Sequence, residues 1–151
     1  MDFGYSFELI TGPMSCGKTE ELLRRIRRSI IAKRKVKVIS PDIDTRAKGD
    51  YIESRNGLWL DAIKVKHAVQ IMTVVKPEDE VIAIDELQFF DSNIVKVISK
   101  LMDEGKKVIG TGLELDLAHN FNFHAHFLLS NIAPFVFFCP VPQLLEQNIR
   151  E

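Results

Sequence analysis

The stretch Gly12-Pro13-Met14-Ser15-Cys16-Gly17-Lys18-Thr19 decides the fold of this 151-residue chain. It fits the pattern G-x-x-x-x-G-K-[ST] at every specified position, and this pattern is typical of a loop that wraps a polyphosphate. An expected strand over residues 7–11 precedes the stretch, and a helical repeat with Leu22, Leu23 and Ile26 follows it. A strand, a glycine-rich turn and a helix in this order predict a nucleotide-binding α/β domain.

The chemistry of the predicted loop follows from its residue types. Glycines allow backbone N–H groups to turn inward around phosphate oxygens, and the N-terminus of the following helix adds a partial positive charge. We expect Lys18 to bring its ammonium to the β- and γ-phosphates and the Thr19 hydroxyl to ligate Mg²⁺. The sequence has no Asn-Lys-x-Asp signature for guanine, so ATP is the expected nucleotide along the whole loop from Gly12 to Thr19.

A second motif follows the apolar run of residues 81–84, where Asp85 and Glu86 stand side by side. A continuous apolar run of this kind is typical of a strand buried on both faces. An acidic residue at the carboxyl end of such a strand commonly holds Mg²⁺, directly or through water, and we expect Asp85 to do so at the ATP site. Glu86 would then lie at the tip of the strand, where a carboxylate can accept the proton of an attacking hydroxyl or water.

The rest of the chain alternates apolar runs with helical patterns, which favours an α/β fold with a mostly parallel central sheet. We predict a P-loop NTPase-like three-layer sandwich over residues 1–140, followed by a short C-terminal stub at 141–151. Ile30 and Ile31 are expected on the inward face of the first helix, and Ser92 is expected to cap a helix that Gly105 ends. Further expected elements are strands over 36–40, near 62–65, over 108–111 and over 135–139, helices over 67–75 and near 125–132, and a long polar loop over 42–60.

Composition excludes several classes of protein. The hydrophobic share of 46% and the charged share of 27% are ordinary for a globular domain, and no apolar run approaches the length of a membrane span. The first residues lack the basic region of a secretory signal, and two cysteines, Cys16 and Cys139, cannot build a disulfide scaffold. We therefore expect a cytoplasmic protein without a membrane partner.

Taken in order, the motifs of the chain resemble the type II thymidine kinases, the cellular, poxviral and bacterial class. The resemblance extends from about Phe7 to Val136, and its combination of motifs is far more specific than the phosphate loop alone. The motifs are Gly12-Pro13-Met14 with the segment from Gly17 to Arg25, Asp44-Thr45-Arg46, the segment from Ser54 to Leu58, Asp85-Glu86-Leu87-Gln88-Phe89-Phe90, and the segment from Gly112 to Leu117.

The resemblance implies transfer of a phosphoryl group from ATP to the 5′-hydroxyl of thymidine, a step of nucleoside salvage for DNA synthesis. Glu86 would be the base that takes the hydroxyl proton, and Arg46 would face the phosphoryl group in transfer. Gln88 would make a polar contact at the ATP site, and Phe90 is expected in the core, because neighbours on a loop seldom point the same way. The predicted substrate-binding residues are Met14, Asp44, Phe89, Leu113 and Leu117.

The sequence departs from the family near its C-terminal end. Type II thymidine kinases carry a zinc ribbon with two cysteine pairs and a long lasso loop that closes over the base, whereas this sequence has no C-x-x-C pair. We expect no zinc site, because the one spare cysteine, Cys139, cannot supply four ligands. A missing lasso predicts an open acceptor pocket that excludes water less well and orients the nucleoside loosely.

Two other interpretations stay open beside a kinase that uses ATP, Mg²⁺ and a small-molecule nucleoside. One is a catalytically weak or silent ATP-binding protein with a regulatory or assembly role. The other is an ATPase whose basic stretch at residues 20–37, with eight basic and two acidic residues, touches nucleic acid. We expect that stretch to be a solvated helix face, and so expect no nucleic-acid partner. The resemblance also implies a homo-oligomer, either a dimer or a tetramer.

Overall fold

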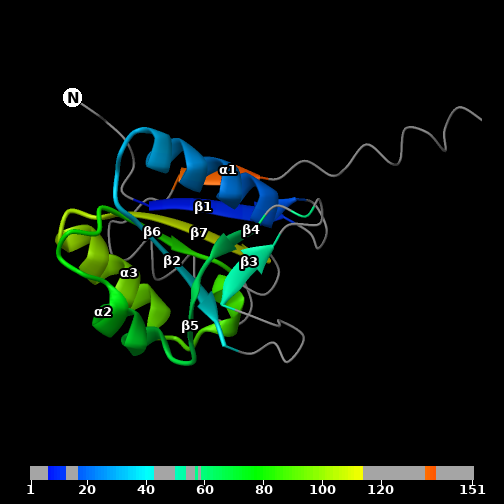
Figure 1. Cartoon of the computed structure of the whole chain (residues 1–151). Helices are drawn as coiled ribbons and strands as arrows, with labels where there is room; N and C mark the ends of the chain where they lie inside the picture. Colours follow the sequence, from blue (N-terminus) through cyan, green and yellow to red (C-terminus); the bar gives the residue numbers. More distant parts are fainter. Residues whose placement is uncertain are drawn as a thin grey trace, which may run out of the picture.

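A six-stranded parallel sheet forms the centre of the fold, with the strand order β5-β2-β6-β7-β1-β8 (Figure 1). The computed structural model describes residues 7–12, 17–42, 50–53, 57, 59–113 and 135–138, and for residues 113 and 135–138 it describes the backbone alone. The strands of the sheet are β1 (Phe7–Gly12), β2 (Val36–Pro41), β5 (Ile63–Val65), β6 (Val81–Ile84), β7 (Lys107–Leu113) and β8 (Phe135–Phe138).

Helices cover both faces of this sheet (Figure 1). The helix α1 (Lys18–Ile31) packs on one face. The other face carries the 3-10 turn η1 (Ala68–Gln70), α2 (Ile71–Val74) and α3 (Ile94–Asp103). The predicted three-layer α/β architecture with a parallel central sheet is therefore confirmed.

Each face of the sheet has its own hydrophobic core, and β6 contributes to both. Ile82 and Ile84 pack toward α3, whereas Val81 and Ala83 pack toward α1, and all four are fully buried. A strand that is covered on both faces has no position where water can solvate a polar side chain. This explains why residues 81–84 form an uninterrupted apolar run.

The apolar side of α1 is shorter than the sequence predicted. Leu22, Leu23 and Ile26 are fully buried, but Ile30 and Ile31 are 50% and 80% exposed, so their expected burial is wrong. Ile31 follows Ile26 by five residues, which turns it about 140° around the helix. Ile30 lies in the last turn, and neither core among the described residues extends to it.

The basic side of α1 is partly neutralised by neighbouring carboxylates. Arg25 donates to Glu8 of β1 over 2.6 Å and to Glu21 over 2.9 Å, and Arg24 donates to Glu21 over 2.7 Å. The pair Arg25–Glu8 joins the helix to the sheet, with both side chains partly buried. Arg24, Arg27 and Arg28 are exposed, so this side of the helix faces solvent as predicted.

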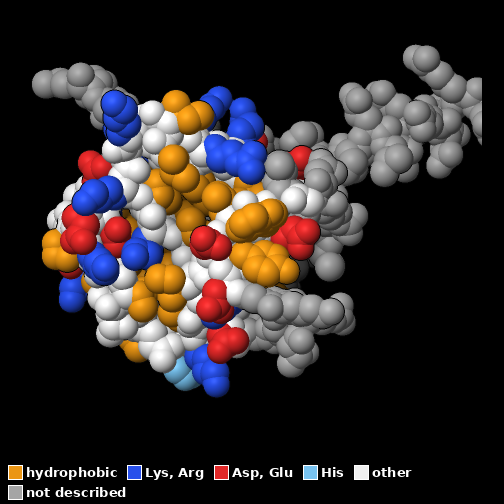
Figure 2. Space-filling model, viewed as in Figure 1, with side chains coloured by type: hydrophobic (Ala, Val, Ile, Leu, Met, Phe, Trp, Pro, Cys, Tyr) orange, Lys and Arg blue, Asp and Glu red, His pale blue; other side chains and the backbone are white. Residues whose placement is uncertain are grey.

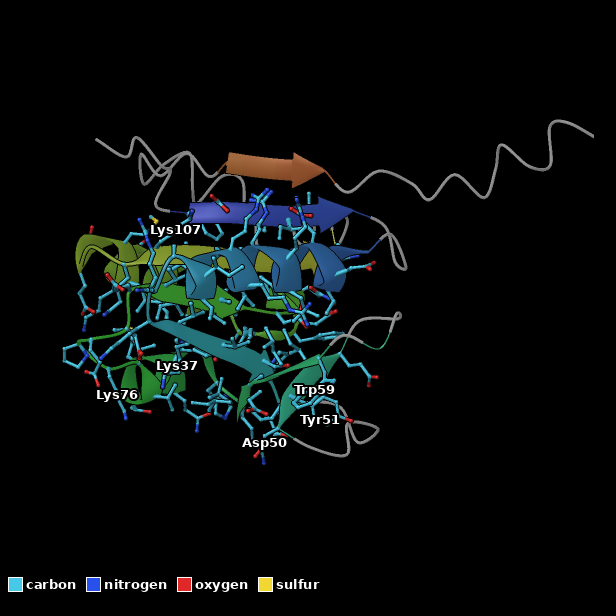
Figure 3. All side chains as sticks on the ribbon, turned by 45° about the horizontal axis from the view of Figure 1, so that its top comes forward. Lys37, Asp50, Tyr51, Trp59, Lys76 and Lys107 are labelled. Carbon is cyan, nitrogen blue, oxygen red and sulfur yellow. The ribbon has the colours of Figure 1, made fainter. Side chains whose placement is uncertain are left out.

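A small hairpin was missed by the sequence interpretation, which treated residues 42–60 as a loop. Strands β3 (Tyr51–Glu53) and β4 (Trp59–Asp61) pair antiparallel. Ile52 is 3% exposed and joins the core under α1. The Tyr51 and Trp59 rings pack edge to face, with their centroids 6.4 Å apart. Figure 2 shows hydrophobic side chains beside acidic ones over this hairpin, and Figure 3 shows Tyr51 and Trp59 together, far from Lys76 and Lys107.

The helix α3 ends as predicted but begins differently. Gly105 has a φ of +81°, and its N–H donates to the Met102 carbonyl while Lys106 N–H donates to the Leu101 carbonyl, as in a Schellman motif. The N-cap is Asn93, without a side-chain capping bond, so the prediction of Ser92 as the cap is wrong. The helix is held instead by its apolar side, which packs on β7 and η1.

Other expected elements agree with the structure or lie outside it. The expected strands over 36–40, near 62–65, over 81–84 and over 108–111 correspond to β2, β5, β6 and β7, and the helix over 67–75 divides into η1 and α2. The predicted helix near 125–132 and the stub at 141–151 lie outside the described residues. Within the described ranges, no helix is long and apolar enough to cross a membrane.

Candidate active site at the carboxyl edge of the sheet

Parallel strands bring their carboxyl ends to one edge of the sheet, and the predicted site residues gather there. Gly12 ends β1 and pairs with Leu113, which ends β7. Asp85 directly follows β6, and its N–H donates to the carbonyl of Ile39 in β2 over 2.9 Å. Segments that are far apart in the sequence thus meet at the position where open α/β sheets bind ligands.

The start of α1 is built around Gly17 and Lys18. Gly17 is the N-cap with a φ of +93°, a left-handed conformation that a glycine adopts without strain. Lys18 is 8% exposed, and its Nζ donates to the carbonyl of Gly12 over 3.2 Å. The ammonium is therefore folded back over the end of β1, at the mouth of the segment that the motif identifies as a phosphate loop.

Asp85 is a buried carboxyl held by a threonine from the neighbouring strand. The Thr111 hydroxyl donates to Asp85 Oδ1, and the residue is 6% exposed. Burial raises the pKa of Asp85. The hydrogen bond from Thr111 and the positive charges of Lys64 and Lys18 lower it, but their effect is smaller than that of burial. A cation bound directly to this carboxyl would offset the cost of burying its ionised form.

Glu86 turns the chain away from the sheet. Its φ of +53° is left-handed, which is uncommon for a residue with a side chain, and its N–H donates to Thr111 Oγ1 over 3.0 Å. The Gln88 side-chain amide donates to Glu86 Oε2. Burial and the neighbouring Asp85 raise the pKa of Glu86, while the Gln88 bond and the charge of Lys18 lower it.

A polar row crosses the sheet beneath α1, and sequence reasoning missed most of its members. Val38 and Ile109 line the core on the α1 side, so Ser40 and Thr111, two positions later in β2 and β7, point the same way. Asp85, directly after β6, accepts the hydrogen bond of the Thr111 hydroxyl on this side. Lys64 of β5 pairs with Ser40 and donates to its hydroxyl over 3.2 Å. The available signal was a polar residue that ends each apolar strand, at the edge where Asp85 was already expected.

The two phenylalanines after Gln88 point in different directions. Phe90 is 2% exposed and belongs to the core against α3, as predicted. Phe89 is 49% exposed in the short turn η2 (Leu87–Phe89). Gln88 is buried, and its amide reaches back to the glutamate that begins this turn.

Part of the predicted site lies outside the described residues: Pro13, Met14, Ser15, Cys16, Asp44, Arg46 and Leu117. Of the others, the structure brings Gly12, Gly17, Lys18, Asp85 and Glu86 to one edge, and Thr19 follows Lys18 in the first turn of α1. Their roles as ATP, substrate and metal ligands stay predictions.

The residues present fit Mg²⁺. The Asp85 carboxylate and the Thr19 hydroxyl offer hard oxygen ligands, and Mg²⁺ usually takes one or two such protein groups and completes its shell with water and phosphate oxygens. Within the described ranges, no three His, Cys, Asp or Glu side chains gather as a metal-binding group. The donor set thus suits a metal that arrives together with phosphates.

The comparison with protein families agrees with this arrangement. The family model described as thymidine kinase matches residues 5–134, which include the phosphate-loop motif, all of α1, the Asp85–Glu86 pair and every strand of the central sheet except β8. A match of this extent covers far more than half of the 151 residues. The chain therefore belongs to the thymidine kinase family, the group of kinases that phosphorylate nucleosides.

Proposed function

We propose that the protein transfers the γ-phosphoryl group of ATP, in a Mg²⁺-dependent reaction, to the 5′-hydroxyl of thymidine. The observation that carries the proposal is the meeting of Lys18, Asp85 and Glu86 at one edge of the sheet in a member of the thymidine kinase family. A protein that only binds nucleotides needs the ammonium, but it has no use for a second carboxyl beside the first.

The chain's own residues divide the work of the reaction. The phosphate loop from Gly12 to Thr19 binds the triphosphate through backbone N–H groups, and Lys18 adds its charge at the β- and γ-phosphates. Thr19 and Asp85 would hold Mg²⁺, which supplies positive charge between the phosphates when it is bound. Together these residues would hold the γ-phosphate in position for transfer.

Glu86 acts on the acceptor. Its carboxylate accepts the proton of the 5′-hydroxyl while the oxygen attacks the γ-phosphorus, the bond to the bridging oxygen breaks, and the electron pair of that bond leaves with ADP. A pKa raised by burial makes the carboxylate a stronger base than an exposed glutamate. The products are ADP, thymidine 5′-monophosphate and a proton that Glu86 later releases to water.

The test is a transfer assay with Mg²⁺, ATP labelled at the γ-phosphate, and a panel of five nucleosides: thymidine, deoxyuridine, deoxycytidine, deoxyadenosine and deoxyguanosine. We expect label in thymidine and deoxyuridine monophosphates alone. ATP binding without transfer to any nucleoside would instead identify a silent nucleotide-binding protein. Hydrolysis without an acceptor, together with salt-sensitive binding to DNA or RNA, would identify an ATPase.

A further inference from the structure

Lys64 occupies a position that the reaction described above does not use. It lies in β5, pairs with Ser40 and points to the α1 face of the sheet, the face on which Asp85 also lies. Its ammonium is partly buried and donates to Ser40 Oγ over 3.2 Å. Of the residues that the structure describes, Ser40 is the only one to which an observed hydrogen bond joins it, and an ammonium has three protons to donate.

The strand order sets the direction from which this charge approaches. Lys18 follows β1, so it reaches Asp85 across β7, whereas Lys64 reaches it from β5 across β2. Both ammonium groups are close enough to favour the ionised form of Asp85, and no ion pair within 4.0 Å joins Lys64 to that carboxylate among the contacts of the described residues. The ammonium groups of Lys18 and Lys64 thus approach the Asp85 carboxylate from opposite sides. The Lys64 ammonium forms no direct ion pair with it among the described contacts.

We propose that Lys64 is a second phosphate-binding cation, which contacts the phosphoryl group while it moves from ATP to the acceptor. The proposal rests on the proposed function. Lys18 is at the donor end of the reaction, beside the loop that binds the triphosphate. Lys64 lies on the β2 side of Asp85, away from that loop, and the proposal places there the negative charge that the phosphoryl group carries as it leaves ADP. A partly desolvated ammonium that already faces this position needs little reorganisation to bind the developing charge.

Ser40 holds the ammonium in place. The hydroxyl lies directly beside Lys64 in the neighbouring strand and is 5% exposed, so it fixes the end of a side chain that would otherwise have many rotamers. A lysine that served only to stabilise the fold would gain more from a carboxylate partner, as Lys107 does with Glu8 at 2.9 Å. Lys64 has a neutral partner and keeps its charge available for an anion.

The test compares two titrations by calorimetry, one with MgADP and one with MgADP plus aluminium fluoride, which imitates the phosphoryl group in transfer. Lys64→Met is compared with the wild-type chain, with Lys64→Arg, and with Lys66→Met, which removes the same charge from an exposed position two residues later. We expect Lys64→Met to weaken the fluoride complex about 10- to 100-fold and MgADP less than threefold. Lys64→Arg should recover part of the loss, and Lys66→Met should match the wild type.

Two results would overturn the role of Lys64. Equal weakening of MgADP and of the fluoride complex, together with a lower melting temperature, would make Lys64 a structural residue. Unchanged binding of both would remove it from the site. Failure of the proposed function looks different, because then the wild-type chain itself would bind MgADP without phosphorylating thymidine, while the comparison of the two titrations would still report on Lys64.

Discussion

At the scale of single residues, Thr111 separates the roles of two adjacent carboxyl groups. Its hydroxyl donates to Asp85 Oδ1 and accepts the backbone N–H of Glu86, so one side chain fixes both the first carboxyl and the turn that carries the second. Asp85 is buried beneath α1, whereas Glu86 is only partly buried and begins the η2 turn. The sequence Asp-Glu thus gives one buried and one partly exposed carboxyl, which suits the proposed division into a cation ligand and a proton acceptor.

The role of Glu86 is tested by Glu86→Gln, which keeps the shape and the contact with Gln88 but removes the base. We expect turnover to fall about 10²- to 10⁴-fold, the range typical of a lost general base, with ATP affinity nearly unchanged. Steady-state transfer to thymidine and calorimetry with ATP measure the two quantities. The matched control is Glu78→Gln at an exposed position, and a comparable loss of ATP affinity in Glu86→Gln would argue against the assigned role.

Burial of Asp85 has a predicted effect on stability. Because burial raises the pKa of Asp85, the folded chain keeps this proton to a higher pH than the unfolded chain. The contribution of the protonated Asp85 carboxyl to the free energy of unfolding is therefore complete at acid pH. It is lost as the pH rises through the raised pKa of the folded state. Without metal or nucleotide, Asp85→Asn should melt a few degrees higher than the wild type near pH 8 and no higher near pH 4.

Thermal unfolding in the presence of a chelator measures this difference. If the Asp85→Asn variant were less stable than the wild type at pH 8, the ionised form of Asp85 would be stabilised by its surroundings rather than destabilised by burial. The same variant should lose Mg²⁺-dependent ATP binding, so the carboxyl would be retained for function at a cost in stability.

At the scale of elements, the contact between η2 and β7 positions the turn that carries Glu86 and Gln88. A Cβ on Gly110 would lie 2.5 Å from Leu87 Cδ1 and 3.2 Å from its Cγ, so Leu87 packs against the bare backbone of β7. Gly110→Ala should push Leu87 and the turn that carries Glu86 and Gln88. We expect a loss of about 1–3 kcal/mol in stability, with a fall in turnover larger than any change in ATP affinity.

Gly105 provides the control for that variant. Its φ of +81° makes Gly105→Ala strained, although nothing lies within 4 Å of the added carbon, and it is at the opposite edge of the sheet, before β7 begins. We expect Gly105→Ala to cost about 1–2 kcal/mol and to leave turnover unchanged. Equal effects of the two variants on turnover, measured well below their melting temperatures, would show that Gly110 matters only for general stability.

The elements also show where sequence patterns suffice. Buried strands such as β6 and the glycine that ends α3 were predictable, because periodicity and a left-handed glycine are local signals. The β3–β4 hairpin was not, because each strand spans three residues and its stability comes from Ile52 under α1, a contact between distant segments. The burial predicted for Ile30 was wrong for the same reason, because only the packed structure shows that the helix extends beyond the residues it packs against.

At the scale of the whole molecule, the parallel topology assembles the site. The phosphate-loop motif and the Asp85–Glu86 pair were identified from the sequence, since each is a short motif beside an apolar run. Thr111, Ser40 and Lys64 were not, because their place depends on the order of four strands and on the register between them. Local motifs therefore located the edge of the sheet that holds the candidate site, whereas the neighbouring polar groups depend on the assembled sheet.

Calorimetric titration of the folded chain with ATP and Mg²⁺ is the most direct test of the central claim, that the loop ending in Lys18 binds a triphosphate beside Asp85. We predict one saturable site per chain and a 10- to 100-fold loss of affinity, roughly the worth of a charge-assisted contact, in Lys18→Ala. Circular dichroism and thermal melting confirm that both proteins are folded. The absence of binding heat at millimolar ATP, or equal affinity of the two proteins, would contradict the account.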